Sequence, residues 1–509
     1  MEDENKPRYK PANLQQDAFV PICFDKQILP GTFEYALHHL MEHRVDLSAF
    51  DAYYDNAKLG ARAYHPKVLL KIVLFGYARG LIGSRRIERA CRENVQFIAL
   101  GGEAKPDHAT IAAFISRSPG AIKAVFQEVL LVCDQAGLIG REHFAIDGVK
   151  LPSNASKDGS GRLDELQARA DKLDRAVERM LEAHALEDAR DAQGNLETHA
   201  ARQIEKLNCQ SAKIKAFLRE ARPKLGPNGK ERKSNVTDND SAKMKTGKGT
   251  IQGYTAVAVT DDRHQVIVEA EAHGTPQEQE LLQPVLDALR EGFQELDLAD
   301  NILAEAKLLA DAGFHSEANL AWLEAEHCDA YVADNLFRKR DPRFADADKY
   351  KPPKPKPTHF RPADFSYNPA RQSCTCPAGK ALYRNGSNVR INNRSGIKFT
   401  APKSACGNCH LRSRCLRNEQ QKTPRQVVFF REPDNQDNPI ERMKAKIDSP
   451  VGRMHYSRRL GTVEPPFGNL RHHKGMNRFT LRGRKKVDGQ WKLYALVHNI
   501  EKLAHYAAW

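Results

Sequence analysis

The segment HFAIDGVKLP, residues 143–152, restricts the fold of this chain more than any other stretch. It is a short apolar run that ends in Asp147 and Gly148, which is typical of a buried strand that stops at a carboxylate. A second apolar run, within residues 302–311, ends at Asp311 in the same way. An Asp at a strand end is also a common loop cap, so each acid taken alone is weak evidence for a site.

The elements around these two acids alternate between strand and helix. Residues 249–273 are rich in Val, Ile and Tyr on both sides of the polar turn TDDRHQ, which predicts an antiparallel hairpin. An amphipathic helix follows over residues 280–293, a helix capped near Ser316 comes after Asp311, and DAYVA is a further short strand. This order predicts an α/β fold with a mixed sheet.

The N-terminal quarter of the chain has a helical pattern. Apolar residues recur at spacings of three and four through residues 65–81, 84–94 and 106–118, with Pro66 in a first-turn position and Ser84 and Asp107 as N-caps. Short helices joined by short turns resemble a helix-turn-helix bundle. Arg85, Arg86 and Arg89 would then face DNA; a helical domain with a solvated basic face is the alternative.

A heptad pattern separates the first acid from the strand hairpin. Because the turn AQGN between its halves is short, the pattern predicts an antiparallel helical hairpin. An intermolecular coiled coil is the alternative. The apolar positions of this seam are Leu163, Leu166, Ala170, Leu173, Val177 and Met180, followed by Ile204, Leu207, Ile214 and Leu218.

Charge and hydropathy indicate the class of partner. The 509 residues carry a formal net charge of +14, which favours a polyanion such as nucleic acid or an anionic membrane surface. The N-terminus lacks the pattern of a signal peptide, and no apolar run is long enough to cross a bilayer. We therefore expect a cytoplasmic protein without a membrane partner.

Glu464 is the acid whose surroundings are most unusual. From Arg453 to Lys486 the sequence has ten Lys or Arg residues, and Glu464 is its one acid. A carboxylate that holds a metal ion beside a DNA strand would need such neighbours to bind phosphates. Asp147, Asp311 and Glu464 together could hold two divalent cations that clamp the oxygens of a phosphodiester. Pro465 and Pro466 place Glu464 near a helix start in this interpretation.

These segments resemble the DDE transposases of bacterial insertion sequences, in particular the large group with an inserted cysteine-rich segment. FAIDGVKLPSNAS is similar to the first acidic motif of that group, LLADAGFHSEAN to the second and VEPPFGNLRHHKGM to the third. Residues 64–117 resemble its N-terminal DNA-binding domain, and residues 237–268 its strand hairpin. The resemblance spans most of the chain.

The resemblance implies a ribonuclease-H-like fold and assigns roles to residues. Asp147, Asp311 and Glu464 would be the catalytic, metal-binding triad for Mg²⁺ or Mn²⁺. The family also has a Tyr, Arg, Glu and Lys series; Tyr456 and Arg459 fit its first spacing, the spacing from Arg459 to Glu464 is one residue longer, and Arg471 replaces the lysine. The residues then expected to contact DNA in this region are Tyr456, Arg459, Arg471 and Lys474.

The activity implied is the cutting and joining of DNA at terminal inverted repeats. Metal ions would activate water to cut a strand, and then the freed 3′-hydroxyl to attack target DNA. The partners would be double-stranded DNA, as element ends and as target, and a second copy of the chain, because two ends must be paired. An inactive end-binding repressor and a metal-dependent nuclease without a joining step are the alternatives.

The cysteines gather in one region. Five of the ten, Cys374, Cys376, Cys406, Cys409 and Cys415, lie within CTCPAGK and CGNCHLRSRC. This pattern offers more than the four thiolates that a structural Zn²⁺ requires. Unligated reduced cysteines and an iron–sulfur cluster are the other readings.

These features predict the following domain division. Residues 1–125 would form a helical, helix-turn-helix-like DNA-binding domain, and residues 140–345 and 450–509 a ribonuclease-H-like catalytic core. The helical hairpin would be an insertion over 160–222, and a proline-rich linker with the cysteine-rich insertion would occupy 346–449.

Overall fold

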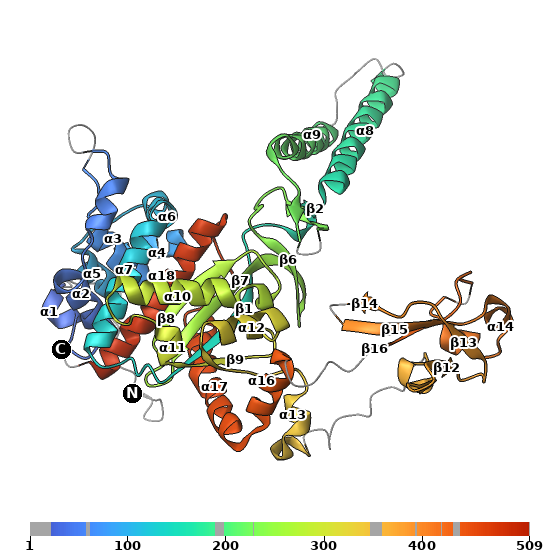
Figure 1. Cartoon of the computed structure of the whole chain (residues 1–509). Coiled ribbons are helices and arrows are strands. Elements are labelled where there is room, and N and C mark those ends of the chain that lie inside the picture. Colours follow the sequence, from blue (N-terminus) through green and yellow to red (C-terminus); the bar gives the residue numbers. More distant parts are fainter. Residues whose placement is uncertain are drawn as a thin grey trace, which may run out of the picture. The chain divides into compact units, whose positions relative to one another are not determined.

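The chain divides into two compact units. The first is made of residues 1–334 and 449–509, and the second of residues 335–448 (Figure 1). Most of the proline-rich linker predicted from the sequence, residues 347–358, lies outside the described residues. A computed structural model describes residues 22–56, 62–188, 198–226, 229–346, 359–391, 394–418, 420–430 and 438–507.

The first unit is built on a six-stranded mixed sheet. Its order is β10-β9-β1-β7-β8, and β6 also pairs with β7. β7 is antiparallel to its neighbours β1 and β8, whereas β1, β9 and β10 run parallel. This is the α/β arrangement with a mixed sheet that the order of the elements predicts, and it is consistent with the ribonuclease-H-like fold that the resemblance implies. The strands are β1 (His143–Pro152), β6 (Ala242–Thr246), β7 (Gly249–Asp261), β8 (Ile267–His273), β9 (Lys307–Ala310) and β10 (Asp329–Val332).

Helices cover both faces of this sheet. Side chains alternate between the faces along β1. His143 and His455 of α17 (Pro450–Gly468) form a hydrogen bond of 2.8 Å on one face, while Phe144 meets Phe293 of α10 (Leu282–Glu295) edge-on at the other. The central strand β7 is consequently buried from Gln252 to Asp261, which accounts for its run of Val, Ala and Tyr.

The prediction that β1 stops at Asp147 is wrong. The strand continues to Pro152, because β7 extends beyond that point and pairs with it as far as Gly253. The parallel neighbour β9 does end at Ala310, which pairs with Ile146. Asp147 and Asp311 are therefore the next residues along two adjacent strands, one still in the sheet and the other in the loop that leaves it.

The N-terminal helices pack around the C-terminal helix α18 (Arg484–Tyr506). The rings of Tyr77 and Tyr494 stack at 4.5 Å, and the Trp491 indole donates to the Val257 carbonyl of β7 at 2.8 Å. Leu493, Leu496 and Ile500 of the same helix are fully buried. The helices are α2 (Phe33–His43), α3 (Pro66–Ala78), α4 (Ser84–Glu93), α5 (Val95–Gly101), α6 (His108–Arg117) and α7 (Pro119–Gln135).

Capping follows the sequence with one exception. Pro66 begins α3, and the Asp107 carboxylate accepts from Thr110 N at 2.7 Å at the start of α6, as predicted. Ser84 is the first residue of α4 and Gly83 its N-cap, so the predicted cap is displaced by one residue.

The predicted helical hairpin is present within one chain. α8 (Leu163–Asp188) and α9 (Thr198–Glu220) pack together through Leu166, Ala170 and Ile214, and Asp174 pairs with Lys215 at 2.6 Å. The intermolecular alternative is not needed to bury this seam. Short elements complete the unit: α1 (Phe24–Gln27), η1 (Ser48–Tyr53), η2 (Lys157–Gly159), β2 (Ser160–Gly161), β3 (Lys224–Leu225), β4 (Glu231–Arg232), β5 (Ser234–Asn235), η3 (Glu278–Glu280), α11 (Ile302–Glu305), α12 (Glu317–Ala325) and η6 (Asn469–His473).

The second unit has its own sheet, in the order β11-β12-β13-β15-β14 with β16 on β15. Its small core includes Phe365, Leu382, Ile397 and Phe399. The elements are α13 (Phe337–Arg340), η4 (Pro342–Phe344), η5 (Pro362–Asp364), β11 (Ser366–Asn368), β12 (Ser373–Thr375), β13 (Ala381–Arg384), β14 (Val389–Ile391), β15 (Arg394–Thr400), α14 (Lys403–Gly407), α15 (Arg412–Cys415), β16 (Gln426–Phe430) and α16 (Pro439–Asp448).

Candidate active site

Asp147 and Asp311 form a half-buried acidic pair at the end of β9. The Asp147 carboxylate accepts from Gly148 N at 2.8 Å and from Arg459 Nη1 at 3.3 Å. The Asp311 carboxylate accepts from Gly313 N at 2.8 Å, which fixes the loop that follows β9. Sheet register therefore brings together two acids that are far apart in the sequence.

The electrostatics of the pair are set by burial and by Arg459. Burial raises the pKa of Asp147; Arg459 and the Gly148 N–H oppose this shift, and the nearby Asp311 adds to it. For Arg459, burial lowers the pKa, but Asp147, Tyr456 and Asp311 more than offset it, so the guanidinium stays charged. The guanidinium thus supplies positive charge at a position where two carboxylates would otherwise repel each other.

Glu278 is a third acid at this place, and the sequence analysis missed it. Its Oε1 lies 3.3 Å from Lys150 Nζ, and a Cβ placed on Gly313 would collide with its Oε2 and stand 3.0 Å from Asp311 Oδ1. Burial raises the pKa of Glu278; Lys150 opposes this shift, and Asp311 and Asp147 add to it. Glu278 lies in the polar stretch TPQEQE after β8, where no apolar run points to it.

The residues of this cluster suit a hard divalent cation. Carboxylate oxygens are the ligands that Mg²⁺ and Mn²⁺ prefer, and Arg459 stands in for such a cation beside Asp147. Gly313 leaves open the space beside Asp311 and Glu278 that a side chain would fill. Within the part of the chain that the structure describes, no three His, Cys, Asp or Glu side chains are already grouped as metal ligands.

Two family matches bear on this geometry. Residues 375–504 match the family described as Transposase DDE domain, and residues 22–117 match the Transposase domain (DUF772). Both matches are to transposase domains, and each covers less than half of the chain. They are consistent with an enzyme of an insertion sequence, and no curated protein matches the chain. The Transposase DDE domain match includes Glu464 and α17, whereas Asp147 and Asp311 lie before it.

Glu464 does not join the acid pair in a ready-made group of three metal ligands among the residues that the structure describes. It is exposed in the last turns of α17, so the prediction of a helix start at the two prolines is wrong. The helix runs from Pro450 through Pro465 and Pro466 and continues as the π-helical turn η6. At the start of this turn, Asn469 N donates to the carbonyls of both prolines. A proline disturbs the usual hydrogen bonds inside a helix, and the wider π-helical turn accommodates that disturbance.

The predicted DNA-contact residues near Glu464 differ in their surroundings. Arg459 of α17 contacts Asp147, and Tyr456 of the same helix is near enough to Arg459 to raise the pKa of its guanidinium. Lys474 is nearly buried, and its ammonium pairs with Glu501 of α18. Its contact with DNA stays a prediction. Arg471 is half-buried within η6.

The predicted N-terminal contacts lie on α4. Arg85, Arg86 and Arg89 are exposed, while Ile87, Ala90 and Cys91 on the other side of this helix are buried. Arg89 Nε lies 4.0 Å from Glu93 Oε1. The basic face is therefore real, and whether it meets DNA stays a prediction.

None of the described helices combines the length and apolar character needed to cross a bilayer.

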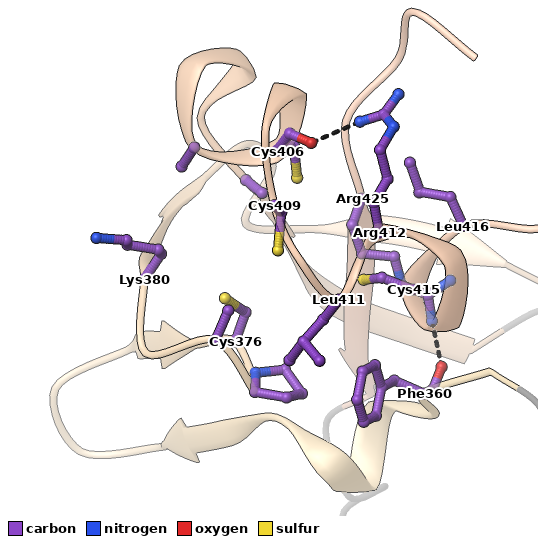
Figure 2. A pocket seen from close by; sticks show the side chains of 14 residues that line it. Phe360, Cys376, Lys380, Cys406, Cys409, Leu411, Arg412, Cys415, Leu416 and Arg425 are labelled. Atoms are coloured by element: carbon purple, nitrogen blue, oxygen red, sulfur yellow. Dashed lines mark hydrogen bonds between the residues drawn. The ribbon is translucent and has the colours of Figure 1, made fainter. Parts of the chain in front are cut away.

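The five clustered cysteines of the second unit do not share one environment. Cys374 is buried in β12 against the core of this unit, whereas Cys376, Cys406, Cys409 and Cys415 line one small cavity (Figure 2). No disulfide joins any of the cysteines that the structure describes.

Proposed function

We propose that this transposase cuts and joins DNA at the terminal inverted repeats of its insertion sequence, with divalent metal ions held by Asp147, Asp311 and Glu464. The observation that carries the proposal is the pairing of Asp147 with Asp311 at adjacent strand positions, neutralised by Arg459. A bound Mg²⁺ or Mn²⁺ would polarise the scissile phosphodiester and activate the attacking oxygen.

The side chains of the chain itself have separate tasks in this proposal. The sheet holds Asp147 in place, because Asp147 pairs with Ala258 of β7 and the residue before it, Ile146, pairs with Ala310 of β9. Arg459 keeps the pair ionised until a cation binds, and it then becomes available to a DNA phosphate, to which guanidinium binds well. Tyr456 and Arg471 would contact the same strand.

The third carboxylate comes from α17 in this proposal. Glu464 follows Arg459 on the helix that already contacts the acid pair, and the family match covers it. Glu278 is assigned to the pair with Lys150, with its other oxygen beside the Gly313 loop. Variants of the two glutamates separate these roles.

DNA outside the cut site would be bound by the exposed arginines of α4, in a dimer that pairs two element ends. A basic helix face binds phosphates without reading sequence, so this contact supplies affinity and orientation.

The test is a plasmid assay on DNA that carries the gene with its own flanks. The purified full-length chain is compared with Asp311→Asn, Glu464→Gln and Glu278→Gln, in Mg²⁺ and in EDTA. Asp300→Asn and Glu317→Gln, which change exposed acids near Asp311 in the sequence, are the matched controls. We expect cuts at the flanks and joined products from the unaltered chain and both controls.

The expected losses differ among the variants. Asp311→Asn, Glu464→Gln and EDTA should each reduce cutting by roughly 10³-fold or more, since several kcal/mol of transition-state stabilisation are lost. Glu278→Gln should retain measurable cutting. Loss of cutting in Glu278→Gln with activity kept in Glu464→Gln would move the third carboxylate to Glu278. Binding of the flanks without any cut would contradict the proposal and favour an end-binding repressor, and cuts without joined products would favour a nuclease.

A further inference from the structure

Four cysteines of the second unit converge on one cavity from three short segments. Cys376 follows β12, Cys406 lies on α14, Cys409 lies between the two short helices, and Cys415 ends α15. Their sulfur atoms face a common space in Figure 2. The cavity between them is small, at about 30 Å³.

The backbone around the cavity is held by turns that present the thiols inward. Cys376 N donates to the Lys380 carbonyl at 2.9 Å and Gly379 N to the Cys376 carbonyl at 2.8 Å, with Gly379 in the left-handed region at φ +73°. Arg412 N donates to the Cys409 carbonyl at 3.0 Å, and the Arg412 guanidinium donates to the Cys406 carbonyl at 2.6 Å. The thiol-bearing turns are therefore fixed by main-chain hydrogen bonds.

Cys374 differs from the other four in position. It pairs with Leu382 of β13 and Tyr367 of β11, is 1% exposed and packs in the apolar core. The cavity lining does not include it. The sequence alone offered five cysteines for four ligand positions, and the structure separates the fifth as a core residue.

We propose that Cys376, Cys406, Cys409 and Cys415 bind one structural Zn²⁺ as four thiolates. Four thiols release four protons, and a tetrahedral Zn²⁺ with four thiolates carries a net charge of −2. Lys380, Arg412 and Arg425 line the same cavity and balance this charge. Because no three of these side chains among the described residues are already at ligand spacing, binding must draw the turns together.

The size of the second unit gives the ion its role. The core of this unit is a small cluster, and many of its strands are three or four residues long. Domains that cannot bury enough apolar surface commonly gain stability from a metal ion. The cavity joins the β12–β13 turn to α14 and α15, so a metal would tie the sheet to the segment between β15 and β16.

The experiment measures the metal in the full-length chain purified without added metal. Elemental analysis should give about one zinc per chain. Replacement by Co²⁺ should give the thiolate charge-transfer band in the near ultraviolet and the intense visible bands of tetrahedral Co²⁺. Cys409→Ser should lower the zinc content and weaken both sets of bands, whereas Cys209→Ser, an exposed cysteine of α9, should change neither.

A core variant completes the design. Cys374→Ala should retain zinc, since its thiol packs among apolar groups and an alanine is tolerated there more easily than a polar serine. Absence of stoichiometric zinc together with failure to bind Co²⁺ would overturn the proposal. So would equal zinc loss in Cys209→Ser and Cys409→Ser, or iron with inorganic sulfide in place of zinc.

Discussion

The acid pair of the first unit and the cysteine cavity of the second both gather metal-ligand side chains, but by different means. Asp147 and Asp311 are neighbours because β1 and β9 are paired inside a large buried sheet. The four cysteines are neighbours because turns and short helices meet at the edge of a small sheet. Arg459 already places one positive charge beside the acid pair, within a large sheet. The small core around the cysteine cavity offers less support, so in our proposal the second unit depends on its metal more than the first.

The largest effect should appear when zinc is removed. Structural zinc contributes about 10–16 kcal/mol of apparent binding free energy in small domains, so chelation should release amide protection throughout the second unit. Hydrogen exchange followed by mass spectrometry should show fast exchange in β12, β13 and β15 after treatment with a strong chelator. The amides of β1 and β7 should remain protected. Equal loss of protection in both units would remove the contrast between them.

The next effect concerns Arg459, whose side chain is 11% exposed beside Asp147 at 25%. Arg459→Met leaves a mostly buried carboxylate without its partner, and the free energy of unfolding should fall by about 1–3 kcal/mol, less than for a fully buried pair because water reaches Asp147. Mg²⁺ should restore part of this loss. Chemical denaturation with and without Mg²⁺ measures both.

Arg458→Met is the matched control on the same helix. Arg458 is 45% exposed and lies 3.3 Å from Asp262, so its loss should cost less than about 1 kcal/mol and should not respond to Mg²⁺. An equal loss of unfolding free energy and an equal response to Mg²⁺ in the two variants would mean that Arg459 does not offset the charge of the acid pair.

A smaller effect should be visible in the pH dependence of stability. The pKa of Asp147 is raised in the folded protein, so the folded state holds the proton more tightly than the unfolded state. The stability that this group contributes is present below its unfolded pKa of about 3.9 and is lost as the pH rises through the raised value. Asp147→Asn should flatten the stability profile in that interval, and Asp300→Asn should leave it unchanged. An unchanged slope in Asp147→Asn would contradict the burial assigned to the pair.

The smallest effect concerns α4, where charge is exposed and no packing is at stake. Arg86→Ala should weaken binding to any duplex DNA and lower the slope of log affinity against log salt by about 1. Folding stability should change by no more than about 0.5 kcal/mol. Fluorescence anisotropy at several salt concentrations measures the slope, and a slope equal to that of the unaltered chain would place DNA elsewhere.

The sequence predicted most of the fold because strand and helix periods are local signals. The strands β7 and β8, the helix α18 and the two halves of the hairpin follow directly from apolar spacing. The sequence also predicted both members of the acid pair. It placed Asp147 at a strand end because Gly148 follows it, and only the pairing with β7 shows that the strand continues.

The remainder of the site depends on contacts that no local pattern encodes. Glu278 meets Asp311 only because Gly313 leaves room for it, and Lys474 pairs with Glu501 only because η6 lies against α18. Proline usually begins or ends a helix, but α17 continues through Pro465 and Pro466. The helix packs against the sheet and runs on into the π-helical turn η6. The spacing of the cysteines predicted a group of five, and only their packing shows that Cys374 belongs to the core of the second unit.

The most direct measurement of the central claim is Mn²⁺ binding to the full-length chain, by electron paramagnetic resonance at a fixed pH. The zinc centre prefers thiolate ligands and should not contribute, so the bound Mn²⁺ reports the carboxylates. We predict saturable binding that is lost in Asp311→Asn and kept in Asp300→Asn. Equal Mn²⁺ binding by both variants would contradict the claim that the paired acids of β1 and β9 hold the metal.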